Sequence, residues 1–398
     1  MDDAARSFPF TPADPLEPPQ EYAELRRDQP VARVRLPSGD LAWLVSRYES
    51  VRQVLADDAR FSREAITAPG APRVLPIAEG SKSIFVMDPP EHTRLRRLVS
   101  KAFTGRRVEA LRPRIQQITD DLLGAMVKGG PPADLMSGLA QPLPITVICE
   151  LLGVPYADVG RFRQWTDLML SFDRSMQDQV RQARERLNDY LTALIEAKRR
   201  EPADDVLTVL IEARDEGDRL SQEELLAFGY TLLGAGYHAT TASIAHAVLT
   251  LLREEDELRL LRSGDRPPLA AVDELLRRSQ AGGGIGALRI ATEDVRLDGV
   301  LIRAGEAVLP MINSANRDET VFDDADGLRL DRRPNPHLSF GHGIHHCLGA
   351  QLGRLELEIA LGSLLRDLPG LRLAVPESGL RWNRGTAFSR PAELPLTW

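Results

Sequence analysis

One helical stretch of this chain is long enough to cross an entire domain, and it constrains the fold more than any other feature. It begins at Ser221, which forms a predicted capping box with Glu224, and its apolar periodicity continues to about Arg253. At a rise of 1.5 Å per residue, such a helix is on the order of 50 Å long. A helix of this length spans a whole molecule, so the fold must be large enough to hold it.

The rest of the 398-residue chain is also mainly helical, with a small β part. Helical periodicity is found at residues 21–27, 48–56, 91–127, 145–152, 159–171, 175–200 and 203–213. Alternating segments at 31–36 and 41–47 predict a hairpin, and strand patterns return at 288–310 and near the C-terminus. Because no linker rich in Gly, Ser or Pro separates two halves, we expect residues 1–398 to form a single, mainly α domain with a small β subdomain (α+β).

Charge and cysteine content exclude several classes of protein. The net charge of -8 argues against a nucleic-acid-binding protein, which needs a basic face. The first residues, MDDAARSFPF, carry no apolar segment, so we expect neither a signal peptide nor a membrane anchor. Only two cysteines are present, and Cys149 lies in an apolar run, which favours a reducing, cytoplasmic setting.

The other cysteine, Cys347, lies in the glycine-rich segment FGHGIHHCLG, directly ahead of a predicted helix with Leu348, Leu352, Leu355 and Ile359 on one stripe. A helix N-terminus stabilises a thiolate. A structural cysteine and a redox thiol are the alternatives for an isolated cysteine. The surroundings favour a ligand, because Phe340 offers an aromatic face, His345 a donor, and three glycines, Gly341, Gly343 and Gly349, would let the backbone approach a large flat group.

This segment resembles the haem-binding signature of the cytochrome P450 family, Phe-x-x-Gly-x-His-x-Cys-x-Gly, at every position: Phe340, Gly343, His345, Cys347 and Gly349. The chain is most similar to soluble actinobacterial members that tailor secondary metabolites. The resemblance implies the cytochrome P450 fold, with haem b (iron protoporphyrin IX) between the long central helix and the helix after the cysteine. It also implies that Cys347 is the proximal thiolate ligand of the iron, where an anionic sulfur favours cleavage of the O–O bond.

A second element of the resemblance is the pair Glu274 and Arg277, one helical turn apart. Taken alone, such a pair is most often a solvated ion pair. In the family it is structural and is completed by a cation in the loop before the cysteine. Gly327 occupies the position where that arginine is expected, and Arg329 or Arg332 could substitute for it.

Cations for the two haem propionates are implied at four positions. Asp88 is the predicted N-cap of a helix in which His92 and Arg96 share one face. This helix resembles the family's His-x-x-x-Arg helix, although an ordinary amphipathic helix would show the same pattern. Arg289 and His345 complete the implied set of donors.

The long helix departs from the family's Ala-Gly-x-acid-Thr-Thr element. In the ungapped alignment that we favour, His238 replaces the acid and Ala239 replaces the proton-delivering threonine, with Thr240 following. The other alignment needs a π-type bulge and places Ala239 at the acid position. Without the acid, protons would come from ordered water, from His238 or Thr240, or from a substrate hydroxyl.

Substrate contacts are expected at Phe85, Gly236, Tyr237, Gly284, Ile285 and Phe388. The segment QAGGGIGALR superficially matches a dinucleotide-binding loop, but no strand precedes it and no helix follows. It predicts either backbone that lines a substrate pocket or a flexible entry into a strand.

The resemblance implies a monooxygenase that hydroxylates or epoxidises a natural-product intermediate, either a small molecule or a carrier-bound one. Electrons would come from a separate ferredoxin and ferredoxin reductase, with docking near Arg94, Arg97, Lys101 and His346. The alternatives are a haem-thiolate oxidase that couples aromatic groups or oxidises a peptidyl or carrier-bound amino acid without inserting oxygen, a non-catalytic haem-binding protein, and a thiol-redox protein.

Overall fold

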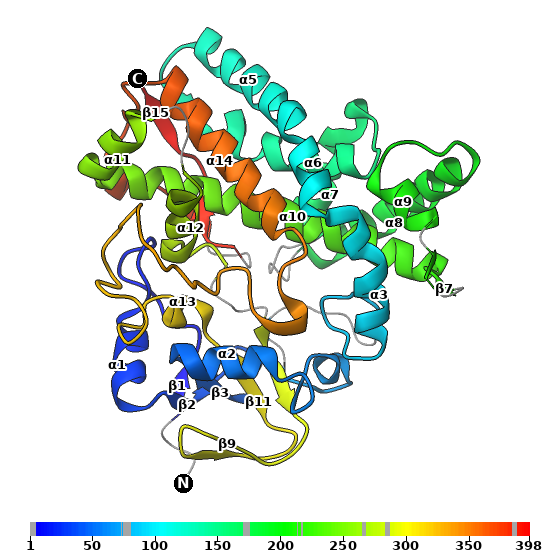
Figure 1. The fold of residues 1–398 in the computed structure, drawn as a ribbon, viewed down its shortest axis with the longest axis vertical. Helices are drawn as coiled ribbons and strands as arrows, with labels where there is room; N and C mark the ends of the chain where they lie inside the picture. The colour runs from blue at the N-terminus through cyan, green and yellow to red at the C-terminus, as the bar shows by residue number, and fades with distance from the viewer. Residues whose placement is uncertain are drawn as a thin grey trace. The chain divides into compact units, whose positions relative to one another are not determined.

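A computed structural model describes residues 5–72, 74, 81–169, 176–212, 214–215, 218–264, 268–282, 287–383 and 388–398 (Figure 1). These residues group into two units. The first comprises Met1–Ser81, Phe85–Thr93 and Asp273–Cys347, and the second comprises Lys82–Ile84, Arg94–Val272 and Leu348–Trp398. Helices α3 (Glu91–Ser100) and α12 (Leu269–Arg278) continue along the chain from one unit into the other.

A six-stranded sheet forms the centre of the first unit, in the order β1-β2-β3-β11-β8-β4. Its strands are β1 (Arg6–Ser7), β2 (Val31–Arg35), β3 (Leu41–Val45), β4 (Phe61–Ser62), β8 (Arg289–Ala291) and β11 (Ala307–Pro310). The predicted hairpin is confirmed, since β2 and β3 pair antiparallel with Val31 opposite Val45. Strands β9 (Val295–Leu297) and β10 (Val300–Ile302) form a second hairpin, whose turn uses positive φ angles at Asp298 and Gly299.

Three helices and two 3-10 turns accompany this sheet. They are α1 (Gln20–Asp28), α2 (Tyr48–Ala56), α13 (Ile312–Ala315), and the turns Glu64–Thr67 and Gly343–His345. Helix α2 packs against β11 and the turn at Gly343–His345 (Figure 1). One core of the unit joins Val51 and Val54 of α2 to Val308 of β11, so burial of the apolar face of α2 fixes that helix on the sheet.

The second unit is built from helices around α10 (Gln222–Arg253). Its other helices are α4 (Gly105–Ala110), α5 (Arg112–Gly129), a π-helical turn (Met136–Ala140), α6 (Pro142–Leu151), a 3-10 turn (Tyr156–Asp158), α7 (Val159–Met169), α8 (Gln177–Arg200), α9 (Val206–Glu212), α11 (Glu255–Arg262) and α14 (Ala350–Asp367). Short 3-10 turns lie at Lys101–Phe103 and Glu377–Gly379, and the strands are β5 (Ala133–Asp134), β6 (Arg214–Asp215), β7 (Asp218–Arg219), β12 (Arg372–Leu373), β13 (Trp382–Asn383), β14 (Arg390–Pro391) and β15 (Pro395–Thr397).

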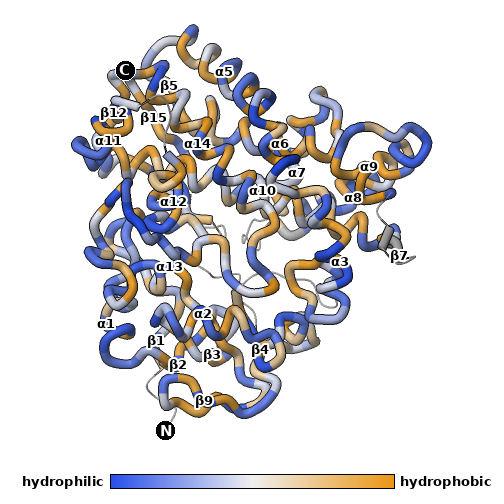
Figure 2. The backbone as a smooth tube through the Cα atoms, in the orientation of Figure 1, coloured by the Kyte–Doolittle hydropathy of each residue, from blue (hydrophilic) through white to orange (hydrophobic). Residues whose placement is uncertain are grey.

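Helix α10 begins as predicted, because the side chain of Ser221 accepts from the Glu224 N–H and the Glu224 carboxylate accepts from the Ser221 N–H. It packs against α6, α8 and α14, and α14 also packs against α5. Hydrophobic residues recur between hydrophilic ones along α14, as Figure 2 shows. Those on its buried side include Leu352, Leu355 and Ile359, in agreement with three members of the predicted stripe. The fourth, Leu348, precedes α14 and is half-buried.

Helix α3 begins at Glu91, where the predicted periodicity starts. The Asp88 backbone carbonyl accepts from the His92 N–H over 3.0 Å, as a residue at a helix start does. The Asp88 carboxylate accepts hydrogen bonds from the Ser62 hydroxyl and from the N–H groups of Arg63 and Glu64. Across the described ranges, no helix is both long and apolar enough to cross a bilayer.

Candidate active site

Cys347 is presented by a loop that closes on itself within the first unit. The Cys347 N–H donates to the Phe340 carbonyl over 2.8 Å, and the His346 N–H donates to the Gly343 carbonyl over 3.0 Å. Gly341 and Gly343 both have φ of 73°, a backbone conformation that favours glycine. Cys347 is exposed, and α14 begins three residues later, after Gly349 as N-cap.

Gly343 is needed for a reason that the sequence did not suggest. A Cβ atom on this residue would lie 2.5 Å from the Leu55 carbonyl oxygen and 2.9 Å from the Ala56 Cα, at the end of α2. Because both contacts are to backbone, any side chain would push the cysteine loop away from α2. A Cβ on Gly341 or Gly349 meets no such obstacle among the described residues.

Two of the predicted propionate ligands, His92 and His345, lie side by side in the first unit. Their ring centroids are 4.4 Å apart, and His92 is only 2% exposed. Arg289 is 3% exposed and donates to the carbonyls of Ala287 and Leu288. Arg96 lies in α3, one turn after His92.

The environment of Arg289 suits an anionic ligand. Burial lowers the pKa of Arg289 to about 9, against the opposing effect of Asp88 and Asp58, so the guanidinium is protonated at neutral pH. Within the described residues, its hydrogen bonds go to backbone carbonyls and none goes to a carboxylate. A buried cation bonded in this way, with two imidazoles in the same unit, fits a carboxylate-bearing cofactor such as haem.

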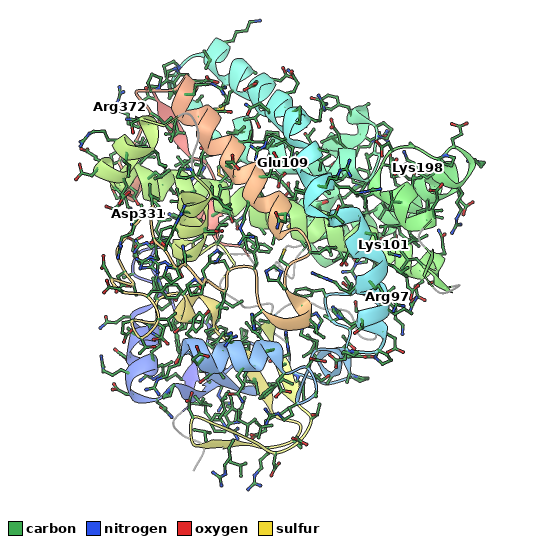
Figure 3. The ribbon with its side chains drawn as sticks, in the orientation of Figure 1. Arg97, Lys101, Glu109, Lys198, Asp331 and Arg372 are labelled. Atoms are coloured by element: carbon green, nitrogen blue, oxygen red, sulfur yellow. The ribbon has the colours of Figure 1, made fainter. Side chains whose placement is uncertain are left out.

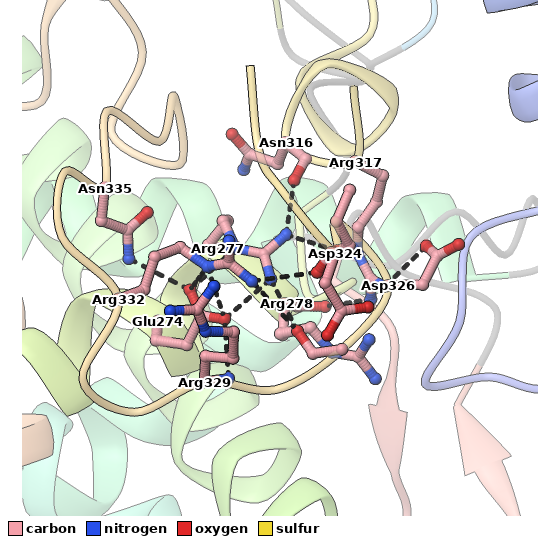
Figure 4. A network of polar contacts seen from close by, with 12 residues as sticks. Glu274, Arg277, Arg278, Asn316, Arg317, Asp324, Asp326, Arg329, Arg332 and Asn335 are labelled. Atoms are coloured by element: carbon pink, nitrogen blue, oxygen red, sulfur yellow. Dashed lines mark hydrogen bonds and ion pairs between the residues drawn. The ribbon is translucent and has the colours of Figure 1, made fainter. Parts of the chain in front are cut away.

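The Glu274–Arg277 pair is fully buried and bidentate, with both N–O distances at 2.8 Å. Arg332 supplies the third member, since its Nε lies 3.0 Å from each Glu274 oxygen (Figure 4). Arg329 contributes only its backbone N–H, and its side chain is 43% exposed. Gly327, at the expected arginine position, accepts from Arg277 through its carbonyl.

Further polar contacts complete this buried network, which consists of Glu274, Arg277, Arg332 and Asn335 and is called here the Glu274 network. Arg277 also donates to the carbonyls of Asn316 and Ala325. Burial alone would raise the pKa of Glu274, but the bonds from Arg277, the Arg329 N–H and Arg332 outweigh it and lower the pKa. The network is therefore a structural element of the loops that precede the cysteine.

Helix α10 runs without a π-type turn in the described residues, which supports the ungapped alignment. Most of the helix from Leu225 to Leu251 is buried, but Ala235 is exposed and Ala239 is half-buried. These two residues are one turn apart. Also only partly buried are Leu226, Ala227, Tyr230, Thr231, Gly234, Gly236 and Ser243.

His238 lies on a buried side of α10 and is 2% exposed. Its Nδ1 is 2.9 Å from Nη1 of Arg390, and its Nε2 is 3.3 Å from the Thr166 carbonyl. Burial, together with the nearby Arg390 charge, lowers the pKa of His238 to about 3. A neutral imidazole with both nitrogens engaged is poorly suited to the proton delivery predicted for it.

Thr240 faces α14, where it interacts with Glu356. Glu356 is 1% exposed, and its Oε1 has no hydrogen-bond partner among the described residues. Burial raises the pKa of Glu356 to about 8, against the opposing effect of the Thr240 hydroxyl, so the carboxyl is protonated at neutral pH. Glu356 was not among the predicted site residues, although a glutamate on the apolar side of a helix is a usable signal.

Of the predicted substrate contacts, two are aromatic residues with ring contacts, two lie on α10, and two lie outside the described residues. Phe85 is 44% exposed and has the Arg63 guanidinium 4.3 Å from its ring centroid, and Phe388 stacks on His238. Tyr237 is fully buried in this structure, so it offers no surface to a substrate, contrary to expectation. Gly236 fits closely against α6, because a Cβ there would meet Ile148 at 2.6 Å. Gly284 and Ile285 lie outside the described residues.

The chain matches the family model described as "Cytochrome P450" over residues 156–262 and 269–369. It is 48% identical to the nocardicin C N-oxygenase of Nocardia uniformis subsp. tsuyamanensis, over 99% of this chain and 98% of that protein. It is equally similar, at 48% identity over 99% of this chain and 98% of that protein, to the mycinamicin IV hydroxylase/epoxidase of Micromonospora griseorubida.

A solved structure of a mutant of the mixed-function P450 MycG in complex with mycinamicin IV superimposes with a TM-score of 0.92. The alignment has 48% sequence identity and covers 99% of this chain and 100% of that one. The expected fold is thereby confirmed. With the Cys347 loop and the Glu274 network in place, these matches show that the chain belongs to the cytochrome P450 family and is a P450 monooxygenase.

Proposed function

We propose that this chain binds haem b through Cys347 and hydroxylates or epoxidises a natural-product biosynthetic intermediate. The observation that carries the proposal is the exposed cysteine in its closed loop, combined with the match to hydroxylases and oxygenases along almost the whole chain. The relatives are named for nocardicin C and mycinamicin IV, which supports a natural product as substrate class.

In this proposal the haem, when bound, supplies the chemistry that activates O2 with two electrons. Cys347 would hold the iron as a thiolate. His92, Arg96, Arg289 and His345 would hold the propionates by charge-assisted hydrogen bonds. Phe340, Gly341 and Gly349 would shape the loop against the cofactor.

Thr240 and Glu356 are the residues that we propose to supply a proton. The carboxyl of Glu356 is protonated at neutral pH, and the Thr240 hydroxyl next to it can accept that proton while passing its own onward. Ala239 cannot take part, because it has no hydroxyl. Thr240→Ala should therefore release much more hydrogen peroxide per NAD(P)H consumed, and unchanged coupling would contradict this role.

The electron donor is proposed to be a ferredoxin, reduced by a separate reductase. Arg97 on α3 and Lys101 in the turn that follows are exposed in the second unit, as is suited to an acidic partner (Figure 3). Arg94 is less suited than expected, because it forms an ion pair with Glu224. Arg97→Glu should slow reduction at low salt, whereas Arg372→Glu, the same charge change on β12, should not.

The proposal is tested by the optical spectrum and by the product. The haem-loaded protein should show the red-shifted Soret band of a thiolate-ligated ferrous-CO complex, and Cys347→Ala should abolish it. Mass spectrometry of the product formed under isotope-labelled O2 should show one labelled oxygen. A product without label would favour the alternative of oxidative coupling, for which the altered residues His238 and Ala239 are the motivating observation.

A further inference from the structure

His238 connects three segments of the second unit that are distant in sequence. From α10, its Nε2 faces the Thr166 carbonyl on α7, and its Nδ1 faces the Arg390 guanidinium on β14. Arginine can only donate hydrogen bonds, so Nδ1 is the acceptor. The ring proton is therefore on Nε2, and it points to the Thr166 carbonyl 3.3 Å away.

Two aromatic rings also lie near the His238 ring. Tyr237 lies at a centroid distance of 4.3 Å, and Phe388 lies nearly parallel, at 6.5 Å and an interplanar angle of 7°. Phe388 is two residues before Arg390, so the C-terminal segment contacts the imidazole at two points. These contacts hold the segment more firmly than a single hydrogen bond would.

The residue type at position 238 follows from these partners. A carboxylate there would accept from Arg390 but would be repelled by the Thr166 carbonyl, because it cannot donate. A neutral imidazole does both, and so does the amide of glutamine. Replacement of the family's acid by histidine thus changes the position from a proton donor into a bridge between α7 and β14.

Asp167 lies near both His238 and Arg390 without bonding to either, and these two long contacts are called here the Asp167 arm. Asp167, the residue after Thr166, has its Oδ1 3.8 Å from both Nε2 of His238 and Nη2 of Arg390, which is longer than a hydrogen bond. This oxygen and the Tyr237 hydroxyl are both buried, and the Asp167 carboxyl interacts with that hydroxyl. A displacement of α7 by about 1 Å would bring Asp167 within bonding distance of Arg390.

We propose that His238 and Arg390 are positioning residues, which clamp α7 and the segment carrying Phe388 onto α10. The contact between Phe388 and substrate is part of the proposed function, and in that respect the proposal rests on it. In the clamp, Arg390 fixes the tautomer of His238, and His238 fixes the end of α7. Asp167 strengthens the clamp when α7 moves closer to Arg390.

Hydrogen exchange of the haem-loaded full chain tests the clamp without any substrate. Loss of two buried hydrogen bonds in His238→Leu should speed exchange of the α7 amides at residues 159–169 by about tenfold or more. His238→Gln should restore most of the protection, because its amide can both donate and accept. A comparison variant is His246→Leu, which removes another buried imidazole of α10, one that faces the Ser389 carbonyl beside Arg390. Because His246 bonds to Ser389 and not to α7, its effect on α7 exchange should be smaller than that of His238→Leu.

A spectroscopic measurement separates this role from proton delivery. In the wild type, the ring resonances of His238 should show no titration between pH 5 and 8, and in Arg390→Met its pKa should rise. Wild-type exchange of α7 in His238→Leu, or failure of His238→Gln to restore protection, would overturn the proposal. A His238 that titrates near neutral pH would also overturn it. None of these measurements needs turnover. A failure of the proposed function would instead be seen in the optical spectrum of Cys347→Ala, so it can be distinguished from a failure of the clamp.

Discussion

Two buried ionic clusters of this protein differ in how completely their charges are paired. In the Glu274 network, one carboxylate receives hydrogen bonds from Arg277, Arg332, Asn335 and the Arg329 N–H, all at 3.1 Å or less. In the cluster around His238, Oδ1 of the Asp167 carboxylate is 3.8 Å from Nη2 of Arg390. The Asp167 side chain is also 41% exposed, whereas Glu274 is fully buried.

The difference indicates distinct roles for the two clusters. A buried charge with every lone pair satisfied has one favourable geometry, and moving any partner leaves an unpaired charge in a low dielectric. A cluster with long, partly solvated contacts can close or open at small cost. The Glu274 network therefore fixes the loops before Cys347, whereas in the His238 cluster the contact between Asp167 and Arg390 is left open at 3.8 Å.

The largest effect is expected for Glu274→Gln. This change leaves two buried guanidinium groups without their anion, and removal of one partner of a buried pair costs about 3–5 kcal/mol. We expect the free energy of unfolding in urea to fall by at least this amount, or the yield of haem-loaded protein to collapse. A loss below about 1 kcal/mol would remove the distinction between the two clusters.

The next largest effect is expected for Arg332, and it should distinguish this residue from Arg329, three residues before it. Arg332→Leu should lower the free energy of unfolding by about 3 kcal/mol, because its guanidinium is 4% exposed and binds both Glu274 oxygens. Arg329→Leu should cost less than about 0.5 kcal/mol, because only its backbone reaches the network. Equal losses in the two variants would show that the third member of the network is misassigned.

Glu356 is a third buried acid to compare with Glu274 and Asp167, and its Oε1 has no hydrogen-bond partner among the described residues. Its folded-state pKa of about 8 lies above the ordinary value of 4.5, so the folded protein retains a proton that the unfolded chain loses. Stability should therefore fall as pH rises from 4.5 to about 8. Between pH 6.5 and 8 the loss should be about 2 kcal/mol, at about 1.4 kcal/mol per pH unit.

Urea unfolding at these two pH values measures this loss, with Glu356→Gln as the variant that should show no such slope. The window avoids His238 and His246, whose folded-state pKa values are lowered to about 3 and 4, so that their effect on stability lies below pH 6.5. The same slope in Glu356→Gln as in the wild type would show that another group is responsible.

The smallest effect is expected for Asp167→Asn. Partly exposed pairs at long distance contribute about 0.5 kcal/mol or less, so the free energy of unfolding should change little. Thermal or urea unfolding of this variant beside Glu274→Gln gives the contrast directly. A loss near that of Glu274→Gln would mean that the Asp167 arm is already closed in the resting protein.

Much of the local structure could be predicted from short-range patterns. Helix α2 has the predicted bounds, 48–56, and the capping box places the start of α10 correctly, because caps and periodicity involve residues within one or two turns. The cysteine loop was recognised from five residues at fixed spacing. The role of its glycines was less predictable. A side chain at position 343 is excluded by the backbone of Leu55 and Ala56, which are distant in the sequence.

The sequence alone thus indicated the family and many of the helices, because each is encoded by neighbours along the chain, and it predicted Cys347 as the haem ligand. The predicted helical stretch 91–127 is divided in the structure into α3, α4 and α5. Only the tertiary structure decided that Arg332 rather than Arg329 reaches Glu274, and that His238 binds Thr166 and Arg390. These partners are 58, 72 and 152 residues apart. Their pairing depends on which polar groups are buried together when the helices pack, and no spacing in the sequence specifies that burial.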